Sequence, residues 1–192
     1  MPRVDGTPGT PRPTPEQIAA AQDATVPDLI RPSLKILFCG INPSLYSAAV
    51  GQHFARPGNR FWPTLHAAGF TPRRLLPSEG QELLALGFGI TNVVARATAT
   101  AAELSPEEFA QGGRLLAEVV ARVQPAAVAV LGITAYRAAF RLRHAVAGKQ
   151  PDRIGGAETW VLPNPSGLNA HYQAGDLARV YRELRQATEN PR

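Results

Sequence analysis

The sequence predicts an α/β protein of three layers (α/β/α), in which a central, mainly parallel sheet lies between two layers of helices. Two features of the chain support this prediction. Four short apolar runs are separated by stretches of helical periodicity, and strands that alternate with helices form βαβ units with parallel strands. The apolar runs are nearly continuous, as a sheet covered on both faces requires. We therefore expect a ligand site beyond the carboxyl ends of the strands.

The chain has 192 residues, enough for one domain with a substantial core. Residues 1–30 contain six prolines among Gly, Thr and Asp, with at most one short helix at 16–21. We expect this stretch to be a flexible leader and residues 31–192 to form a single domain.

The strands are expected at the apolar runs. The first run, residues 34–41, is followed by Asn-Pro, which cannot continue a ladder of hydrogen bonds. The other three runs lie at 89–94, 126–132 and 159–163.

The clearest helix start is the sequence Ser-Pro-Glu-Glu at 105–108. It combines an N-cap serine, a proline at the first helical position and a glutamate at the third, and predicts a helix to about residue 123. Weaker helical patterns lie at 60–68, 78–86, 134–143 and 176–187.

Several classes of site are excluded by what the sequence lacks. The lone Cys39 forbids a disulfide framework and an iron-sulfur cluster held by four thiolates, and the histidines have no ligand-like spacing, so no metal site is expected. No phosphate-binding or dinucleotide-binding glycine motif follows any strand, so no cofactor is expected. Without an apolar run of about 20 residues, the chain is expected to be a soluble, cytoplasmic protein. We also expect it to be a monomer.

Positive charge is concentrated in two segments. The net charge is +5, and residues 31–78 and 119–151 contain six and five basic residues without a single acidic one. A face of this kind suits a polyanion such as a phosphate backbone. The alternative is that arginine-rich, alanine-rich composition reflects codon usage only.

Two strand ends carry unusual loops, Gly-Ile-Asn-Pro-Ser at 40–44 and Pro-Asn-Pro-Ser-Gly-Leu-Asn at 163–169. In both, an asparagine precedes a proline, which biases that asparagine toward extended backbone and restricts where its carboxamide points. Each loop alone is also compatible with ordinary turn chemistry. Two such loops at strand ends of one sheet favour a site.

At these loops the sequence resembles the mismatch-specific uracil-DNA glycosylases, the bacterial branch of the thymine-DNA glycosylase family. Several separated motifs agree in order and spacing, and they lie at 38–43, 53–62, 68–71 and 161–168. The resemblance extends from about residue 34 to the C-terminal helix and implies the uracil-DNA glycosylase fold. It also implies base flipping, because the glycosidic bond cannot be reached inside the duplex.

The resemblance assigns roles to five residues in or near the two loops. Asn42 matches the asparagine that binds the attacking water, and Phe54 matches the aromatic that stacks on the extruded base. The backbone near Ile41 and Phe54 would bind carbonyl oxygens of the base, and Ser47 matches a position near the base. Asn164 stands where sister families have a histidine that donates to the departing base.

The stretch at Gly167, Leu168 and Asn169 resembles the family's wedge, whose apolar side chain fills the space left by the flipped nucleotide. Leu168 could equally be an ordinary loop leucine packed on the domain. Phosphate contacts are expected from arginines of the two basic segments, namely Arg56, Arg60 and Arg137.

The chain departs from the family pattern at three positions. Ser44 replaces the glycine usual after Asn-Pro, Asn92 stands where a lysine is common, and Ala170 follows the wedge at a position that is often basic. These departures leave the preferred lesion and the dependence on a mismatch open.

Together these features predict a monofunctional DNA glycosylase in base excision repair. It would remove uracil, and also thymine or modified pyrimidines, from G:U or G:T mispairs in double-stranded DNA. Two alternatives stay open at this point: a non-catalytic protein that senses mismatched or damaged DNA, and a small-molecule α/β enzyme with an accidental basic face.

Overall fold

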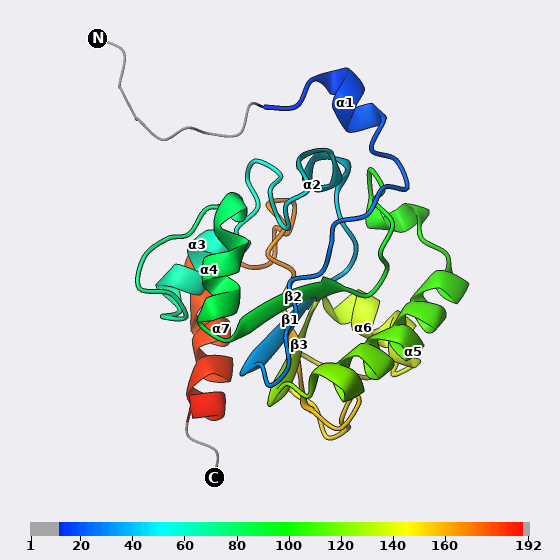
Figure 1. Cartoon of the computed structure of the whole chain (residues 1–192). Coiled ribbons are helices and arrows are strands. Elements are labelled where there is room, and N and C mark those ends of the chain that lie inside the picture. Colours follow the sequence, from blue (N-terminus) through cyan, green and yellow to red (C-terminus); the bar gives the residue numbers. More distant parts are fainter. Residues whose placement is uncertain (1–11, 190–192) are drawn as a thin grey trace.

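Five strands form one sheet in the order β2-β1-β3-β5-β4 in the computed structural model, which describes residues 12–189 (Figure 1). Neighbouring strands run parallel except β4, which pairs antiparallel with β5. The predicted α/β class and mainly parallel sheet are confirmed, and β4 was missed because two residues leave no pattern. The strands are β1 (Ile36–Gly40), β2 (Phe88–Asn92), β3 (Ala127–Leu131), β4 (Gly148–Lys149) and β5 (Glu158–Leu162).

Both faces of the sheet are buried, which explains the continuous apolar runs. Ile36 and Phe38 of β1 belong to one apolar cluster, whereas Leu37 and Cys39 belong to a second cluster on the opposite face. Helices α3, α4 and α7 cover the first face, and α5 and α6 cover the second (Figure 1).

The helices begin and end close to the predicted residues. Ser105 caps α5 as predicted, because its hydroxyl accepts from the N–H of Glu108 while the Glu108 carboxylate accepts from the N–H of Ser105. Helix α6 ends three residues early because Arg141 has a left-handed φ of 57°. The helices are α1 (Pro15–Ala19), the unpredicted α2 (Leu45–Val50), α3 (Phe61–Ala67), α4 (Gly80–Ala85), α5 (Pro106–Val123), α6 (Ile133–Phe140) and α7 (Ala174–Glu189), with short 3₁₀ helices η1 (Pro77–Glu79) and η2 (Ala101–Glu103).

No helix within residues 12–189 is long and apolar enough to cross a membrane.

Part of the proline-rich N-terminal stretch packs on the sheet. Residues 1–11 lie outside the described residues, but Ala21 and Val26 are buried, and Leu29 exchanges backbone hydrogen bonds with Ile90 of β2. The packed chain therefore begins before residue 31, the domain boundary expected from composition. Proline content concealed these few apolar side chains, of which Leu29 pairs with the edge strand β2.

An ion-pair cluster ties the N-terminal stretch to α5. The Arg96 guanidinium donates to both carboxylate oxygens of Glu108 and, at 2.9 Å, to Asp23. The hydrogen bonds from Arg96, together with the N–H of Ser105, lower the pKa of Glu108 to about 2. The cluster therefore holds the loop that carries Arg96 against the first turn of α5.

Replacement of Glu108 by glutamine is expected to lower the thermal unfolding midpoint in a pH-dependent way. The pKa of Glu108 lies below its ordinary 4.5 in the folded chain, so its stabilisation is complete above about pH 4.5 and is lost as the pH falls toward 2. Calorimetry of wild type and Glu108→Gln should show the largest gap above pH 5 and a narrowing gap toward pH 3. Glu107→Gln, on the exposed neighbour, is the control; a gap independent of pH would contradict the assignment.

Candidate active site

A pocket of about 590 Å³ opens at the carboxyl ends of β1, β2, β3 and β5. This is the edge of the sheet at which the sequence predicted a ligand site. The volume lies within the range of about 300–1,000 Å³ typical of small-molecule sites, so it can admit a nucleobase. The walls come from segments 40–47, 53–59, 92–101, 131–134 and 163–172.

The carboxamide of Asn42 lies in the wall of this pocket in a fixed rotation. Its Nδ2 donates to the carbonyl oxygen of Arg96 at 3.0 Å and to Oγ1 of Thr98 at 2.7 Å. A carbonyl can only accept, so the amide nitrogen must face Arg96. Thr98 Oγ1 donates its own hydrogen to the Thr100 carbonyl at 2.8 Å and so meets Asn42 with a lone pair. Within residues 12–189 no hydrogen bond reaches Asn42 Oδ1, which remains an acceptor for a ligand or water.

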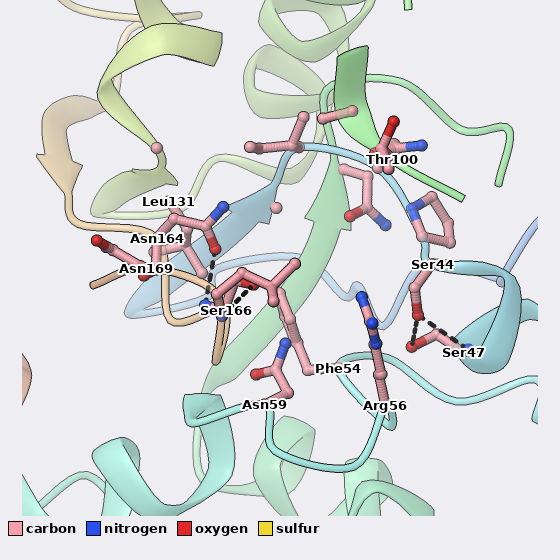
Figure 2. A pocket seen from close by; sticks show the side chains of 18 of the residues that line it. Ser44, Ser47, Phe54, Arg56, Asn59, Thr100, Leu131, Asn164, Ser166 and Asn169 are labelled. Atoms are coloured by element: carbon pink, nitrogen blue, oxygen red, sulfur yellow. Dashed lines mark hydrogen bonds between the residues drawn. The ribbon is translucent and has the colours of Figure 1, made fainter. Parts of the chain in front are cut away.

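Phe54 enters the pocket from a strained loop. It has a left-handed φ of 54°, rare for an aromatic residue, and its ring stacks on Phe61 of α3 at 4.1 Å between centroids. Figure 2 shows Phe54, Arg56 and Asn59 extending from the same loop beside the pocket. The stack on Phe61 fixes the Phe54 ring as an apolar wall.

Ser47 holds this loop in place. Its Oγ accepts from the Ala55 N–H at 3.0 Å and lies 3.1 Å from Ser44 Oγ, which donates to it (Figure 2). Ser44 also caps α2 by accepting from the N–H of Ser47 at 3.2 Å. The serine that departs from the family pattern therefore builds the support of the Phe54 loop.

The floor of the pocket brings Asn92 and Phe54 together over Gly40. A Cβ atom at position 40 would lie 2.5 Å from Asn92 Oδ1 and 3.1 Å from Cζ of Phe54. Only glycine at the end of β1 lets the amide and the ring approach in this way. On its other side, Asn92 Nδ2 lies 3.5 Å from Nδ1 of the buried His53.

The carboxamide of Asn164 is also fixed in rotation. Its Oδ1 accepts from the N–H of Ser166 at 2.9 Å (Figure 2). Since a backbone N–H can only donate, the oxygen must face Ser166, and Nδ2 is left as a donor at the pocket wall. No hydrogen bond from Asn164 Nδ2 to another described residue occupies that donor.

Arg60 organises the loop that carries the predicted wedge. Its guanidinium donates to the carbonyl oxygens of Ser166, Asn169 and Tyr172 at 2.6–2.9 Å. The phosphate contact predicted for Arg60 therefore needs correction, because its N–H groups are directed into the protein. The sequence shows the charge of Arg60 but not its three carbonyl acceptors, which lie more than 100 residues away along the chain.

Within this loop, hydrogen bonds hold the side chain of Asn169 in place, whereas the side chain of Leu168 is exposed. Asn169 Nδ2 donates to the Asn164 carbonyl, and its Oδ1 accepts from the N–H of His171. Leu168 is 75% exposed at the rim of the pocket. Gly167 is required because a Cβ there would lie 2.6 Å from the Gly58 carbonyl oxygen.

The two other arginines that were predicted to contact phosphate, Arg56 and Arg137, lie in different surroundings. Arg56 lines the pocket and is exposed, and it makes no hydrogen bond or ion pair with another described residue. Arg137 lies on α6 outside the pocket wall, and its guanidinium donates to the Ala145 carbonyl at 2.6 and 2.9 Å. The structure thus gives Arg137 a role in fixing the end of α6, and the phosphate contact predicted for this exposed side chain stays a prediction.

Sequence reasoning missed two polar residues of the site, Thr98 and His53, and listed Asn92 only as a departure. Thr98 and His53 are buried and act through partners 56 and 39 residues away, Asn42 and Asn92. No local pattern indicates such contacts. Among residues 12–189 no group of three or more His, Cys, Asp or Glu side chains is arranged to hold a metal ion.

Comparison with known proteins agrees with this architecture. The model of the uracil DNA glycosylase superfamily matches residues 27–186. Among solved structures, the chain is similar to the solution NMR structure of "a putative Uracil DNA glycosylase from Methanosarcina acetivorans". The two share 22% identity over 85% of this chain and 98% of the other, with a TM-score of 0.55, which shows a common fold.

Loss of the Arg60 guanidinium is expected to loosen the 164–172 loop without unfolding the domain. Arg60→Gln removes hydrogen bonds to three carbonyls, each charge-assisted and worth about 1.5–3 kcal/mol. Hydrogen exchange at backbone amides 166–172 should accelerate by at least about tenfold. Arg56→Gln, which removes a nearby charge without internal partners, should leave exchange unchanged; equal exchange in both variants would contradict the role given to Arg60.

Proposed function

The chain belongs to the uracil DNA glycosylase superfamily, and from that premise we propose that it hydrolyses the N-glycosidic bond of uracil mispaired with guanine in double-stranded DNA. The proposed enzyme is monofunctional and leaves an abasic site. The observation that carries the proposal is the rotation of the Asn42 carboxamide, with both amide hydrogens bound to protein and Oδ1 left for water.

Asn42 suits a hydrolysis in which the sugar departs before water attacks. Cleavage of the bond develops an oxocarbenium-like sugar and negative charge on the leaving base. A neutral carbonyl oxygen can orient a water toward the cationic sugar but cannot take its proton as a carboxylate would. The reaction assigned to Asn42 is therefore slow, and the positive charge on the sugar supplies most of the drive for attack.

The opposite wall stabilises the departing base. Asn164 offers its free Nδ2 as a hydrogen-bond donor to the anionic base, and Phe54 offers the face of its ring for stacking. Stacking against an aromatic is worth about 1–3 kcal/mol per base. The donor and the ring act at different edges of one flipped pyrimidine.

Asn92 is proposed to read the base. Its Oδ1 lies over Gly40 beside the Phe54 ring, and no described residue donates a hydrogen bond to it. Uracil and thymine present an N3–H donor between two carbonyl acceptors, which a carboxamide complements with one acceptor and one donor. The same pair of contacts serves both bases, so preference for uracil over thymine has to come from the 5-methyl group.

The exposed Leu168 supports extrusion of the nucleotide. Its side chain lies at the pocket rim on a loop fixed by Arg60 and can replace a flipped nucleotide in the base stack. Mispaired bases are the least costly to unstack, so wedge-driven opening favours G:U over A:U. Neither of the two lysines, Lys35 and Lys149, lines the pocket, which supports hydrolysis without a covalent lyase step.

Excision of uracil is expected to depend on Asn42 and, less strongly, on Thr98. Asn42→Ala should slow single-turnover excision from a G:U duplex by on the order of 10²–10³-fold, because the water loses its acceptor. Thr98→Val keeps the shape but removes one of two hydrogen bonds that set the Asn42 rotation, so a loss of about tenfold is expected. Alkaline cleavage of the abasic product measures both rates.

Thr71→Val is the matched control, since Thr71 Oγ1 is buried without a hydrogen-bond partner among residues 12–189 and Thr71 does not line the pocket. It should excise uracil at the wild-type rate. A G:U-dependent gel shift without strand breakage in the wild type would instead support a mismatch sensor. Equal excision rates on G:U and A:U duplexes would contradict specificity for the mismatch but would still agree with glycosylase activity.

Arg56 is expected to contact a DNA phosphate, whereas Arg137 is not. A phosphate contact releases about one counterion, so Arg56→Gln should reduce the slope of log affinity against log salt by about one. Arg137→Gln, matched in charge, should leave the slope unchanged because Arg137 lies outside the pocket wall and directs Nε and Nη2 to the Ala145 carbonyl. Fluorescence anisotropy at several salt concentrations measures the slopes, and equal slopes for the two variants would refute the distinction.

A further inference from the structure

His53 and Asn92 form a coupled pair at the floor of the pocket. His53 Nε2 lies 2.9 Å from the carbonyl oxygen of Pro27, and Nδ1 lies 3.5 Å from Asn92 Nδ2. The Pro27 carbonyl can only accept, so Nε2 carries a hydrogen. In a neutral imidazole Nδ1 is then the acceptor, and the only end of the Asn92 carboxamide that suits it is the N–H end.

This contact decides which way the Asn92 amide faces. With Nδ2 toward His53, Oδ1 lies over Gly40 beside the Phe54 ring, and the second amide hydrogen meets no acceptor among the described residues. A carboxamide rotated by 180° would exchange the two ends at almost the same shape. An acceptor next to a donor fits the N3–H and O4 edge of uracil, whereas cytosine presents an acceptor at N3 and a donor at N4.

We propose that His53 is a positioning residue that holds the Asn92 carboxamide in the orientation that accepts uracil, and that protonation of His53 reverses this orientation. The inference rests on the proposed function and assigns its base selectivity to a residue that need not touch the base. A protonated imidazole carries N–H donors on both nitrogens. The donor on Nδ1 would then face the N–H donor of Asn92, and this unfavourable contact would rotate the amide by 180°. The amide N–H would then face the N3–H of uracil, so that two donors meet and the base is no longer accepted.

The surroundings keep the imidazole neutral near pH 7. Burial lowers the pKa of His53, outweighing the Pro27 carbonyl and the carboxylate of Asp28, which both favour the protonated ring. Cys39 of β1, whose pKa is raised by burial, is a neutral thiol, and Arg122 of α5 interacts with Asp28. The indole of Trp62 donates to the His53 backbone carbonyl and carries no charge.

The first test is the pH dependence of single-turnover excision from a G:U duplex. Wild-type rate is expected to fall by about tenfold per pH unit once His53 protonates, at a pH below its ordinary pKa of 6.5. His53→Gln, whose amide does not titrate, should lack this acid limb. His171→Gln removes an exposed imidazole from the pocket rim and should retain it. An acid limb that persists in His53→Gln, or disappears in His171→Gln, would overturn the proposal.

The second test reads the pair directly and does not need activity. Nitrogen NMR of the wild-type imidazole should show the Nε2–H tautomer, and Asn92→Leu should raise the pKa of His53 because the neutral ring loses a hydrogen-bond donor. Binding of a duplex with 2′-fluoro-deoxyuridine opposite guanine should lower that pKa. An Nδ1–H tautomer, or a pKa unmoved by Asn92→Leu, refutes the coupling. Absence of excision at every pH would refute the proposed function, and this spectroscopic result would still decide on the pair.

Discussion

Asn42 can present a carbonyl oxygen to the pocket because both hydrogens of its carboxamide are bound by the loop that follows β2. That loop is itself held from outside the site. Arg96, whose backbone carbonyl accepts from Asn42, uses its guanidinium to join Glu108 on α5 and Asp23 on the N-terminal stretch. One contact at the pocket thus depends on a helix cap and on a segment outside the sheet.

The site is built from neutral carboxamides, and each is oriented by a group that can only donate or only accept. The Arg96 carbonyl fixes Asn42, the Ser166 N–H fixes Asn164, and the Pro27 carbonyl acts through His53 on Asn92. A carboxamide needs such a partner because its two ends have nearly the same size and opposite hydrogen-bonding character. Three asparagines can therefore perform three different tasks in one pocket.

The sequence predicts the layers of the fold and the location of the site. It predicts few of the contacts that hold the site residues in place. Apolar runs predict the strands, Ser105 and Glu108 predict the start of α5, and the strand ends predict the pocket. These signals are local, since burial and capping depend on neighbours in the chain. Arg60 and Thr98 meet partners more than 50 residues away, so their roles depend on tertiary contacts that no spacing records.

If Asn42 positions the attacking water as proposed, a neutral group in that role also explains why selectivity would come from extrusion. When the chemical step is slow, a flipped base returns to the stack many times before its bond breaks, and the observed rate is the fraction extruded multiplied by the rate of cleavage. Each 1.4 kcal/mol of difference in opening cost then appears as about a tenfold difference in rate. A carboxylate at position 42 would cleave most extruded bases before they return to the stack, so the difference in opening cost would no longer appear in the rate. In the proposed function, slow chemistry at Asn42 and the Leu168 loop supported by Arg60 would therefore be complementary parts of one discrimination mechanism.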